Sequence, residues 1–275
     1  MKPLSDMKVV TLAVNLPGPV AARHLLRLGA RVLKVEPPAG DPMSLYLDRW
    51  YHALNAGQEV LVLDLKESAE RERLFEELAT ADLLLTASRP RALEGLGLGW
   101  EGLHDRFPHL CMVQIVGYPS PHENEPGHDL TYQAAQGLLV PPHLPRTLIA
   151  DMAGGERAAA EALALLLARE RGQGSGCAIV PLSAVVEALA EPLRQGLTAA
   201  GNLLGGGLAE YNLYPAREGW IAVAALEPHF RQRLAQSLGV HFETPEDLSD
   251  CFTRKSASEW DAWGKDLDLP IVEVK

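Results

Sequence analysis

The stretch MKVVTLAVNLPGPVAARHLLRLGARVLKVE, residues 7–36, decides the fold class. Residues 7–14 are mostly apolar or β-branched, as expected for a buried strand. Proline and glycine at 17–19 then make a turn into an apolar-periodic helix from about Val20 to Leu28. Gly29 ends that helix, and residues 31–36 form a second apolar strand. Strand, helix and strand in this order predict a βαβ unit, which is the start of a parallel sheet.

Further strands and helices follow in alternation. Apolar runs predict strands at 59–65, 82–87 and 110–116, and a charged amphipathic helix covers 68–79. Repeated alternation of this kind predicts a doubly wound sheet with helices on both faces, in which ligands bind at the carboxyl ends of the strands. The turn at Pro17 is one of those ends. No GxGxxG motif follows it, so a dinucleotide-binding fingerprint is absent.

The C-terminal half begins with the segment of strongest helix propensity. Residues 154–171 are almost entirely helix formers, and several glycines directly after them end the helix. A strand at 177–182 and a helix at 184–197 follow, and GNLLGGG at 201–207 has the composition of a hinge. We therefore expect a large domain at 1–200.

The remaining residues, 201–275, predict a second domain. Alternating apolar residues indicate strands at 220–225 and 270–274. Amphipathic segments between them predict helices at 228–238, 245–249 and 257–265. The mixture of strands and helices indicates a smaller α/β domain.

The composition argues against several kinds of protein. Lys and Arg number 25 and Asp and Glu 36, which gives a net charge of −11, so the overall field would repel nucleic acids and anionic membrane surfaces. Three widely spaced cysteines fit neither a disulfide framework nor a zinc site, and the histidines lack metal-ligand spacing. No apolar run is long enough for a signal peptide or a membrane span. We expect a cytoplasmic protein with no metal site, no nucleic-acid partner and no membrane contact.

A His-Asp pair on a glycine turn is the first candidate for chemistry. His128 follows Gly127 and precedes Asp129, so the backbone can turn sharply and present an imidazole from a loop. Such a group can take a proton near neutral pH. On the sequence alone, a solvated loop histidine is the favoured interpretation of the same pattern.

Two carboxylates stand beside predicted helix starts. Asp151 directly precedes the strong helix, where it can simply cap free N–H groups. Gly154 and Gly155 beside it allow a ligand close to those N–H groups, which can also hold a carbonyl oxygen that gains charge. Glu227 stands before a proline at another helix start, where an N-terminal charge is its simplest role. Alone, none of these residues identifies a site.

Taken in order along the chain, several segments resemble the family III CoA-transferases (CaiB/BaiF), and most closely their branch of alpha-methylacyl-CoA racemases. The resemblance implies a Rossmann-like large domain with a parallel sheet, a smaller α/β domain, and a homodimer whose two chains interlock like linked rings. The matching segments are PGPVAARHLLRLGARVLKVEPPAGDP (17–42), LVLDLK (61–66), SRPRALEGLGLG (88–99), PGHDLTYQAAQGLL (126–139), IADMAGGERAAAEALALLLARERGQG (149–174) and VAALEPHF (223–230).

The resemblance also implies a chemistry. In the transferases, an aspartate at the position of Asp151 attacks the acyl thioester and carries the acyl group as a mixed anhydride. In the racemases GHD replaces GYD, as at 127–129 here. His128 and Asp151 would then exchange the α-proton of the acyl group through an enolate, supported by Glu227. The substrate would be a coenzyme A thioester, with no covalently bound cofactor. The positions expected to bind its coenzyme A moiety are Pro17, Lys66, Arg89, Gly154 and Gly155.

The chain departs from the family pattern in its basic residues and its length. Coenzyme A carries phosphates, which family members meet with basic side chains. Here Pro37 follows KVE where arginine is frequent, Ser44 replaces the arginine of GDPxR, and residues 55–59 are NAGQE in place of a basic segment. Family members also continue past the point at which this sequence ends. We therefore expect a C-terminally shortened fold with a looser or different dimer.

Three functions remain open. The first is racemase-like α-proton exchange on a 2-methylacyl-CoA thioester. The second is an acyl-CoA:carboxylate CoA-transferase with Asp151 as the nucleophile, which GHD in place of GYD disfavours. The third is a catalytically degenerate binding or partner protein, suggested by the lost basic residues, although such a protein has no physical need to keep His128. We expect an enzyme, and the first function before the others.

Overall fold

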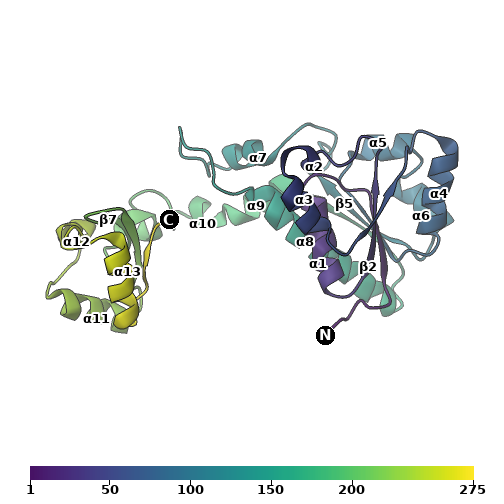
Figure 1. Cartoon of the computed structure of the whole chain (residues 1–275). Coiled ribbons are helices and arrows are strands. Elements are labelled where there is room, and N and C mark those ends of the chain that lie inside the picture. The colour runs from purple at the N-terminus through teal and green to yellow at the C-terminus, as the bar shows by residue number, and fades with distance from the viewer. The chain divides into compact units, whose positions relative to one another are not determined.

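A computed structural model describes residues 1–275, which form two compact units, Met1–Leu189 and Ala190–Lys275 (Figure 1). Each unit has its own sheet and its own core. The division falls before the expected boundary at 200/201. The glycine-rich segment that suggested this boundary belongs to the second unit, where it forms the irregular helical turn η1 (Leu203–Gly207).

The first unit is built on a six-stranded sheet in which all strands are parallel. The strand order is β3-β2-β1-β4-β5-β6, so the order reverses between β1 and β4. This is the doubly wound order of the Rossmann fold, and it confirms the expected Rossmann-like large domain. The strands are β1 (Lys8–Thr11), β2 (Arg31–Glu36), β3 (Glu59–Val62), β4 (Leu83–Thr86), β5 (Cys111–Val116) and β6 (Cys177–Pro181).

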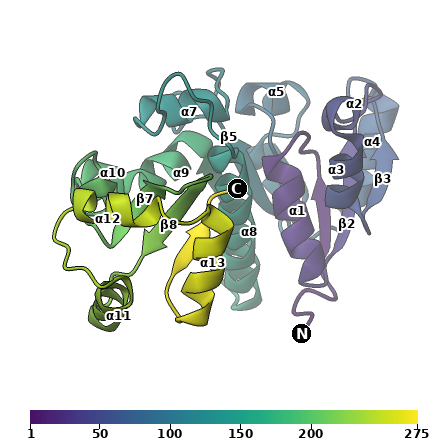
Figure 2. The ribbon, with the colours of Figure 1, turned by 60° about the vertical axis from the view of Figure 1, so that its left-hand side comes forward.

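Helices cover both faces of this sheet (Figures 1 and 2). Alternate strand residues point to opposite faces, so Val9 and Leu83 pack on one side while Val10 and Leu84 pack on the other. Burial on both sides explains why the strands are continuous apolar runs. One face carries α1 (Pro17–Arg27), α8 (Ile149–Glu170) and α9 (Leu182–Leu189), and the other α4 (Ser68–Leu78), α5 (Pro90–Gly95) and α6 (Trp100–Arg106).

The helices differ from the prediction at their starts. The helix α1 begins at Pro17 rather than Val20, because proline is favourable at the first helical position. The helix α8 begins at Ile149, five residues before Gly154. Besides α5 and α6, three further short helices were not predicted, since helices of this length depend on packing rather than propensity. They are α2 (Met43–Tyr46), α3 (Asp48–Asn55) and α7 (Asp129–Ala135).

The second unit confirms a smaller domain of mixed strands and helices. Its sheet is antiparallel in the order β7-β8-β9, and one face packs against helices in a core that includes Tyr214, Phe252 and Trp260. Figure 2 shows α13 beside β8 and β9. The strand β7 was not predicted. The elements are α10 (Glu191–Arg194), β7 (Tyr211–Pro215), β8 (Trp220–Ala224), α11 (Pro228–Leu238), α12 (Pro245–Phe252), α13 (Ala257–Asp266) and β9 (Ile271–Glu273).

Candidate active site

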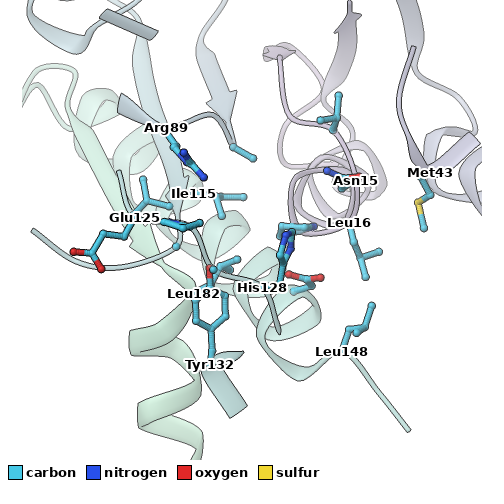
Figure 3. A pocket seen from close by; sticks show the side chains of 18 of the residues that line it. Asn15, Leu16, Met43, Arg89, Ile115, Glu125, His128, Tyr132, Leu148 and Leu182 are labelled. Carbon is cyan, nitrogen blue, oxygen red and sulfur yellow. The ribbon is translucent and has the colours of Figure 1, made fainter. Parts of the chain in front are cut away.

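A cavity of about 420 Å³ lies at the carboxyl ends of β1, β4 and β5, in the first unit (Figure 3). This is the side of the sheet, next to the reversal of strand order, at which doubly wound folds bind ligands. The turn after β1, the loops after β4 and β5, and the helices α2, α3, α7 and α8 all contribute to its wall. The residues used below are Asn15, Pro17, Met43, Tyr46, Trp50, Arg89, Gly117, Glu123, Glu125, Gly127, His128, Tyr132 and Asp151.

Asp129 caps the amino end of α8. Its Oδ2 accepts hydrogen bonds from the backbone N–H groups of Ala150 (2.7 Å) and Asp151 (3.2 Å), and the amide of Gln133 donates to its Oδ1. The carboxylate therefore satisfies free N–H groups at the positive end of the helix dipole. The sequence assigned this capping role to Asp151, which is wrong, because α8 begins at Ile149 and Asp151 lies within its first turn.

Asp151 lines the cavity with a carboxyl group whose pKa is raised. Burial raises this pKa from 3.8 to about 6, the negative charge of Asp129 adds to the rise, and His128 opposes it. The carboxyl can therefore hold or release a proton near the pH at which enzymes work. The N–H groups of Ala150 and Asp151 are bonded to Asp129, so they are not free to bind a substrate oxygen as the sequence suggested.

His128 lines the same cavity from the start of α7. Its backbone N–H donates to Thr131 Oγ1 (3.1 Å), and the Thr131 hydroxyl donates to the His128 carbonyl oxygen (2.7 Å). These reciprocal bonds fix the backbone at the helix start. The imidazole is thus presented from the last residue of the loop that the sequence predicted, which is the N-cap of α7. Figure 3 shows its side chain among those that surround the cavity.

Tyr132 is a cavity residue that the sequence did not single out. It lies four residues after His128, and its side chain is buried with 2% exposed. A Cβ atom at Gly117 or Gly127 would come within 2.7 and 2.6 Å of its hydroxyl oxygen, so both glycines make room for this group. Burial and then nearby Tyr118 and Asp151 raise the pKa of the phenol to about 12, so it stays protonated at neutral pH. The sequence signal that could have identified Tyr132 is its position in the GHDLTY segment, which also contains His128.

The cavity contains little positive charge. Arg89, which precedes α5, is the only Lys or Arg in its wall, and Glu123 and Glu125 lie on the same wall. Pro17 contributes at the start of α1. Lys66 is exposed after β3 and is not among the lining residues.

A family model described as CoA-transferase family III matches residues 4–271. The chain belongs to this family. Its relatives include the cinnamoyl-CoA:phenyllactate CoA-transferase of Clostridium sporogenes, 36% identical over 62% of this chain and 47% of that protein. The alpha-methylacyl-CoA racemase of Homo sapiens is 30% identical over 94% of this chain and 74% of the racemase. The relatives thus include proteins named as CoA-transferases and as a racemase. The chain spans about half the length of the cinnamoyl-CoA:phenyllactate CoA-transferase.

Solved structures agree with the fold. The crystal structure of Rv3272 from Mycobacterium tuberculosis has a TM-score of 0.88 and 26% identity, and the match covers 100% of this chain and 85% of that one. A CAIB/BAIF family protein from Brucella suis, at 21% identity, has a TM-score of 0.84 over 100% of this chain and 84% of that one. The doubly wound sheet is therefore the fold of this family.

Gly154 and Gly155, two of the expected coenzyme A positions, lie in helix contacts. A Cβ on Gly154 would come within 2.2 Å of Leu182 Cδ2. A Cβ on Gly155 would come within 2.7 Å of both the Pro17 carbonyl oxygen and Val20 Cβ. Both glycines are buried and neither lines the cavity. Helix packing is therefore a sufficient reason for glycine at these positions.

Glu227 belongs to the second unit, where it is the exposed residue that precedes α11. Its catalytic role remains a prediction.

No group of three or more His, Cys, Asp or Glu side chains is placed to hold a metal ion. None of the helices combines the length and the apolar character that crossing a bilayer requires.

Proposed function

We propose that this family III protein exchanges the α-proton of a 2-methylacyl-CoA thioester. The proposal rests on one observation above all: His128 and Asp151, from two different helices, line a single cavity at the reversal of the sheet. The Asp151 carboxyl, with a pKa of about 6, is suited to proton transfer near neutral pH, and imidazole is the side chain that most often transfers protons in enzymes.

The reaction needs two proton carriers and a donor for the enolate. One of His128 and Asp151 takes the proton from the α-carbon, and the C–H electron pair moves into an enolate whose charge lies on the thioester oxygen. The other returns a proton to the opposite face, so atoms and charge balance. Tyr132 is a neutral donor in the cavity wall and is our candidate to stabilise the enolate oxygen. Arg89 and Lys66 would attract the phosphates of coenzyme A.

Deuterium wash-in tests this function. In D₂O the wild type should place deuterium at the α-carbon of a 2-methylacyl-CoA, and His128→Gln and Asp151→Asn should each slow this by about 100-fold or more. His122→Gln is the matched control, because His122 lies in the preceding loop, pairs with Glu125 and does not line the cavity. Absence of wash-in by the folded wild type with every such thioester would exclude the proposal.

A CoA-transferase is the second candidate, favoured by relatives with that name and by the cavity position of Asp151. The Asp151 carboxylate would attack the thioester carbonyl, coenzyme A would leave as its thiolate, and a mixed anhydride would form. Hydroxylamine or borohydride should then modify Asp151 during turnover with a carboxylic acid acceptor. An unmodified Asp151 would exclude this chemistry.

A binding protein without catalysis is the third candidate, because Arg89 is the only Lys or Arg in the cavity wall. Calorimetric titration with coenzyme A and an acyl-CoA separates the cases. Micromolar binding of the acyl-CoA together with wash-in supports an enzyme, and binding without wash-in or acyl transfer supports this third function.

We also propose a homodimer, which sedimentation would detect as twice the chain mass of 29.8 kDa.

A further inference from the structure

Next to the cavity, the first unit buries a charged cluster that the proposed chemistry does not use. The Lys34 side chain on β2 is 0% exposed, and its ammonium lies 2.6 Å from Asp41 Oδ2 and 3.0 Å from Glu36 Oε1. The Tyr51 hydroxyl donates to the same Glu36 oxygen at 2.7 Å. A buried ammonium is costly unless it is paired and hydrogen-bonded, so these partners must be held in place.

The second oxygen of Asp41 joins two walls of the cavity. Its Oδ1 accepts hydrogen bonds from the backbone N–H of Asn15 and from that of Met43, each at 3.0 Å. Asn15 lies in the turn after β1, with a φ of 66° that non-glycine residues rarely adopt. Met43 is the first residue of α2. Both residues line the cavity, so one carboxylate oxygen fixes the distance between the turn and the helix.

The Met43 side chain packs with Leu16, Val20 and Leu54 in a small buried cluster, and apart from this contact other interactions attach α2 only weakly. It is a helix of 4 residues whose one buried side chain is Met43. Leu45, Tyr46 and Leu47 are 81%, 64% and 50% exposed, so burial contributes little at these positions. A second link to the turn, from the Tyr46 hydroxyl to Asn15 Oδ1 at 3.0 Å, is exposed to water and therefore weak. Asp41 is the buried polar attachment of this wall.

We infer that Asp41, itself held by Lys34, is a positioning residue that sets the spacing between the Asn15 turn and α2 and thereby the affinity of the cavity for its thioester. This inference rests on the proposed function. Asp41 is 1% exposed and is not part of the cavity wall, so it acts through Asn15 and Met43 and takes no part in proton transfer.

Asp41→Asn tests the inference because a carboxamide has a single acceptor oxygen. In one orientation its NH₂ group faces the Lys34 ammonium, and in the other it faces the two backbone N–H groups. The variant therefore loses either the ion pair with Lys34 or the hydrogen bonds from Asn15 and Met43. Asp82→Asn is the matched control. Asp82 also accepts a backbone N–H, from Lys8 (2.7 Å), and pairs with Arg169 (2.7 Å), but it precedes β4 and so lies at the amino ends of the strands, away from the cavity.

For Asp41→Asn we expect KM for the acyl-CoA to rise about five- to tenfold, the size of one hydrogen bond, with kcat within about twofold. Asp82→Asn should leave both unchanged even if it lowers thermal stability. An equal rise of KM in both variants, or a fall of kcat without a rise of KM, would overturn the inference, because a general loss of stability or a catalytic role would then explain it.

Amide hydrogen exchange gives a readout that needs no substrate. In Asp41→Asn, amides in 13–16 and 42–47 should exchange about five- to tenfold faster than in the wild type, whereas in Asp82→Asn only amides around Lys8 should do so. Unchanged exchange in 42–47 would overturn the inference whatever the activity. Faster amide exchange in 42–47 together with no deuterium wash-in by the wild type would instead count against the proposed function. Calorimetry with coenzyme A would then measure the affinity of the cavity in place of KM.

Discussion

Asp129 and Asp151 carry the same functional group at the same end of α8, but their surroundings differ. Asp129 accepts two backbone N–H groups of the helix and one side-chain amide, which stabilise its charge. Asp151 is desolvated and lies near the charge of Asp129, so its own ionisation is disfavoured. One carboxylate thus holds the helix, while the other lies in the cavity wall with a raised pKa.

Asp151→Asn should increase stability at high pH while it slows the proposed α-proton exchange. The folded pKa of about 6 lies above the ordinary 3.8, so the contribution of this carboxyl to stability is present below pH 3.8 and is lost as the pH rises through 6. A rise of this pKa from 3.8 to about 6 corresponds to at most about 3 kcal/mol. The asparagine variant does not titrate, so between about pH 4.5 and 8 its advantage in unfolding free energy should grow by about 2 kcal/mol.

Urea unfolding at the two pH values measures this difference. Asp105→Asn, at an exposed position on α6, is the control and should show no change with pH. If the advantage of Asp151→Asn is the same at both pH values, the carboxyl has an ordinary pKa in the folded protein.

At the level of elements, the glycines at the start of α8 determine how closely α1 and α8 approach. Gly155 meets the Pro17 carbonyl and Val20 of α1, and Gly154 meets Leu182 of α9. Glycine is unfavourable in a helix interior by about 1 kcal/mol relative to alanine, so packing has to offset that cost. The close approach brings Pro17 and Asp151 to one cavity.

Gly155→Ala should therefore destabilise the protein by about 1 to 3 kcal/mol, because the new Cβ would overlap the Pro17 carbonyl and Val20. Gly102→Ala in α6 is the matched control: no atom lies within 4 Å of its Cβ position, so the better helix propensity should stabilise by up to about 1 kcal/mol. Thermal unfolding of both variants gives the comparison. Equal changes in unfolding free energy, with the same sign in both variants, would show that helix propensity and not packing determines the effect of alanine at these positions.

The elements that could be predicted from the sequence are those with long periodic patterns. The buried strands β2 and β5 and the helix α4 were predicted within a residue or two, because burial fixes their apolar pattern. The short helices α2 and α7 carry too few residues for a period, so their existence depends on capping and tertiary bonds. The start of α8 was missed because its amino end is capped by Asp129, 20 residues before Ile149 in the sequence.

At the scale of the whole chain, the two units have separate cores. Leu85, at 0% exposed, lies in the core between the large sheet and α1 and α8. Phe252, also 0% exposed, packs against Tyr214 and Trp260 in the second unit. Neither core contains residues of the other unit.

We therefore expect urea unfolding in two transitions. Leu85→Ala should shift one of them and Phe252→Ala the other, each by about 3 kcal/mol from the loss of a buried large side chain. Tryptophan fluorescence should separate them in a background that carries Trp50→Phe and Trp100→Phe, because the remaining tryptophans lie in the second unit and Trp260 contacts Phe252 directly. A single transition lowered by both substitutions would mean that the units unfold as one.

The sequence by itself determined the parallel sheet, the two-domain composition and the presence of His128 and Asp151, because apolar periodicity is local and the resemblance to the family is carried by short segments. Only the tertiary structure decided what those residues do. It gave the helix cap to Asp129, raised the pKa of Asp151 through burial, brought Tyr132 to the cavity and joined Asn15 to Met43 through Asp41. Burial and hydrogen bonds between segments far apart in the chain arise only when the sheet brings them together.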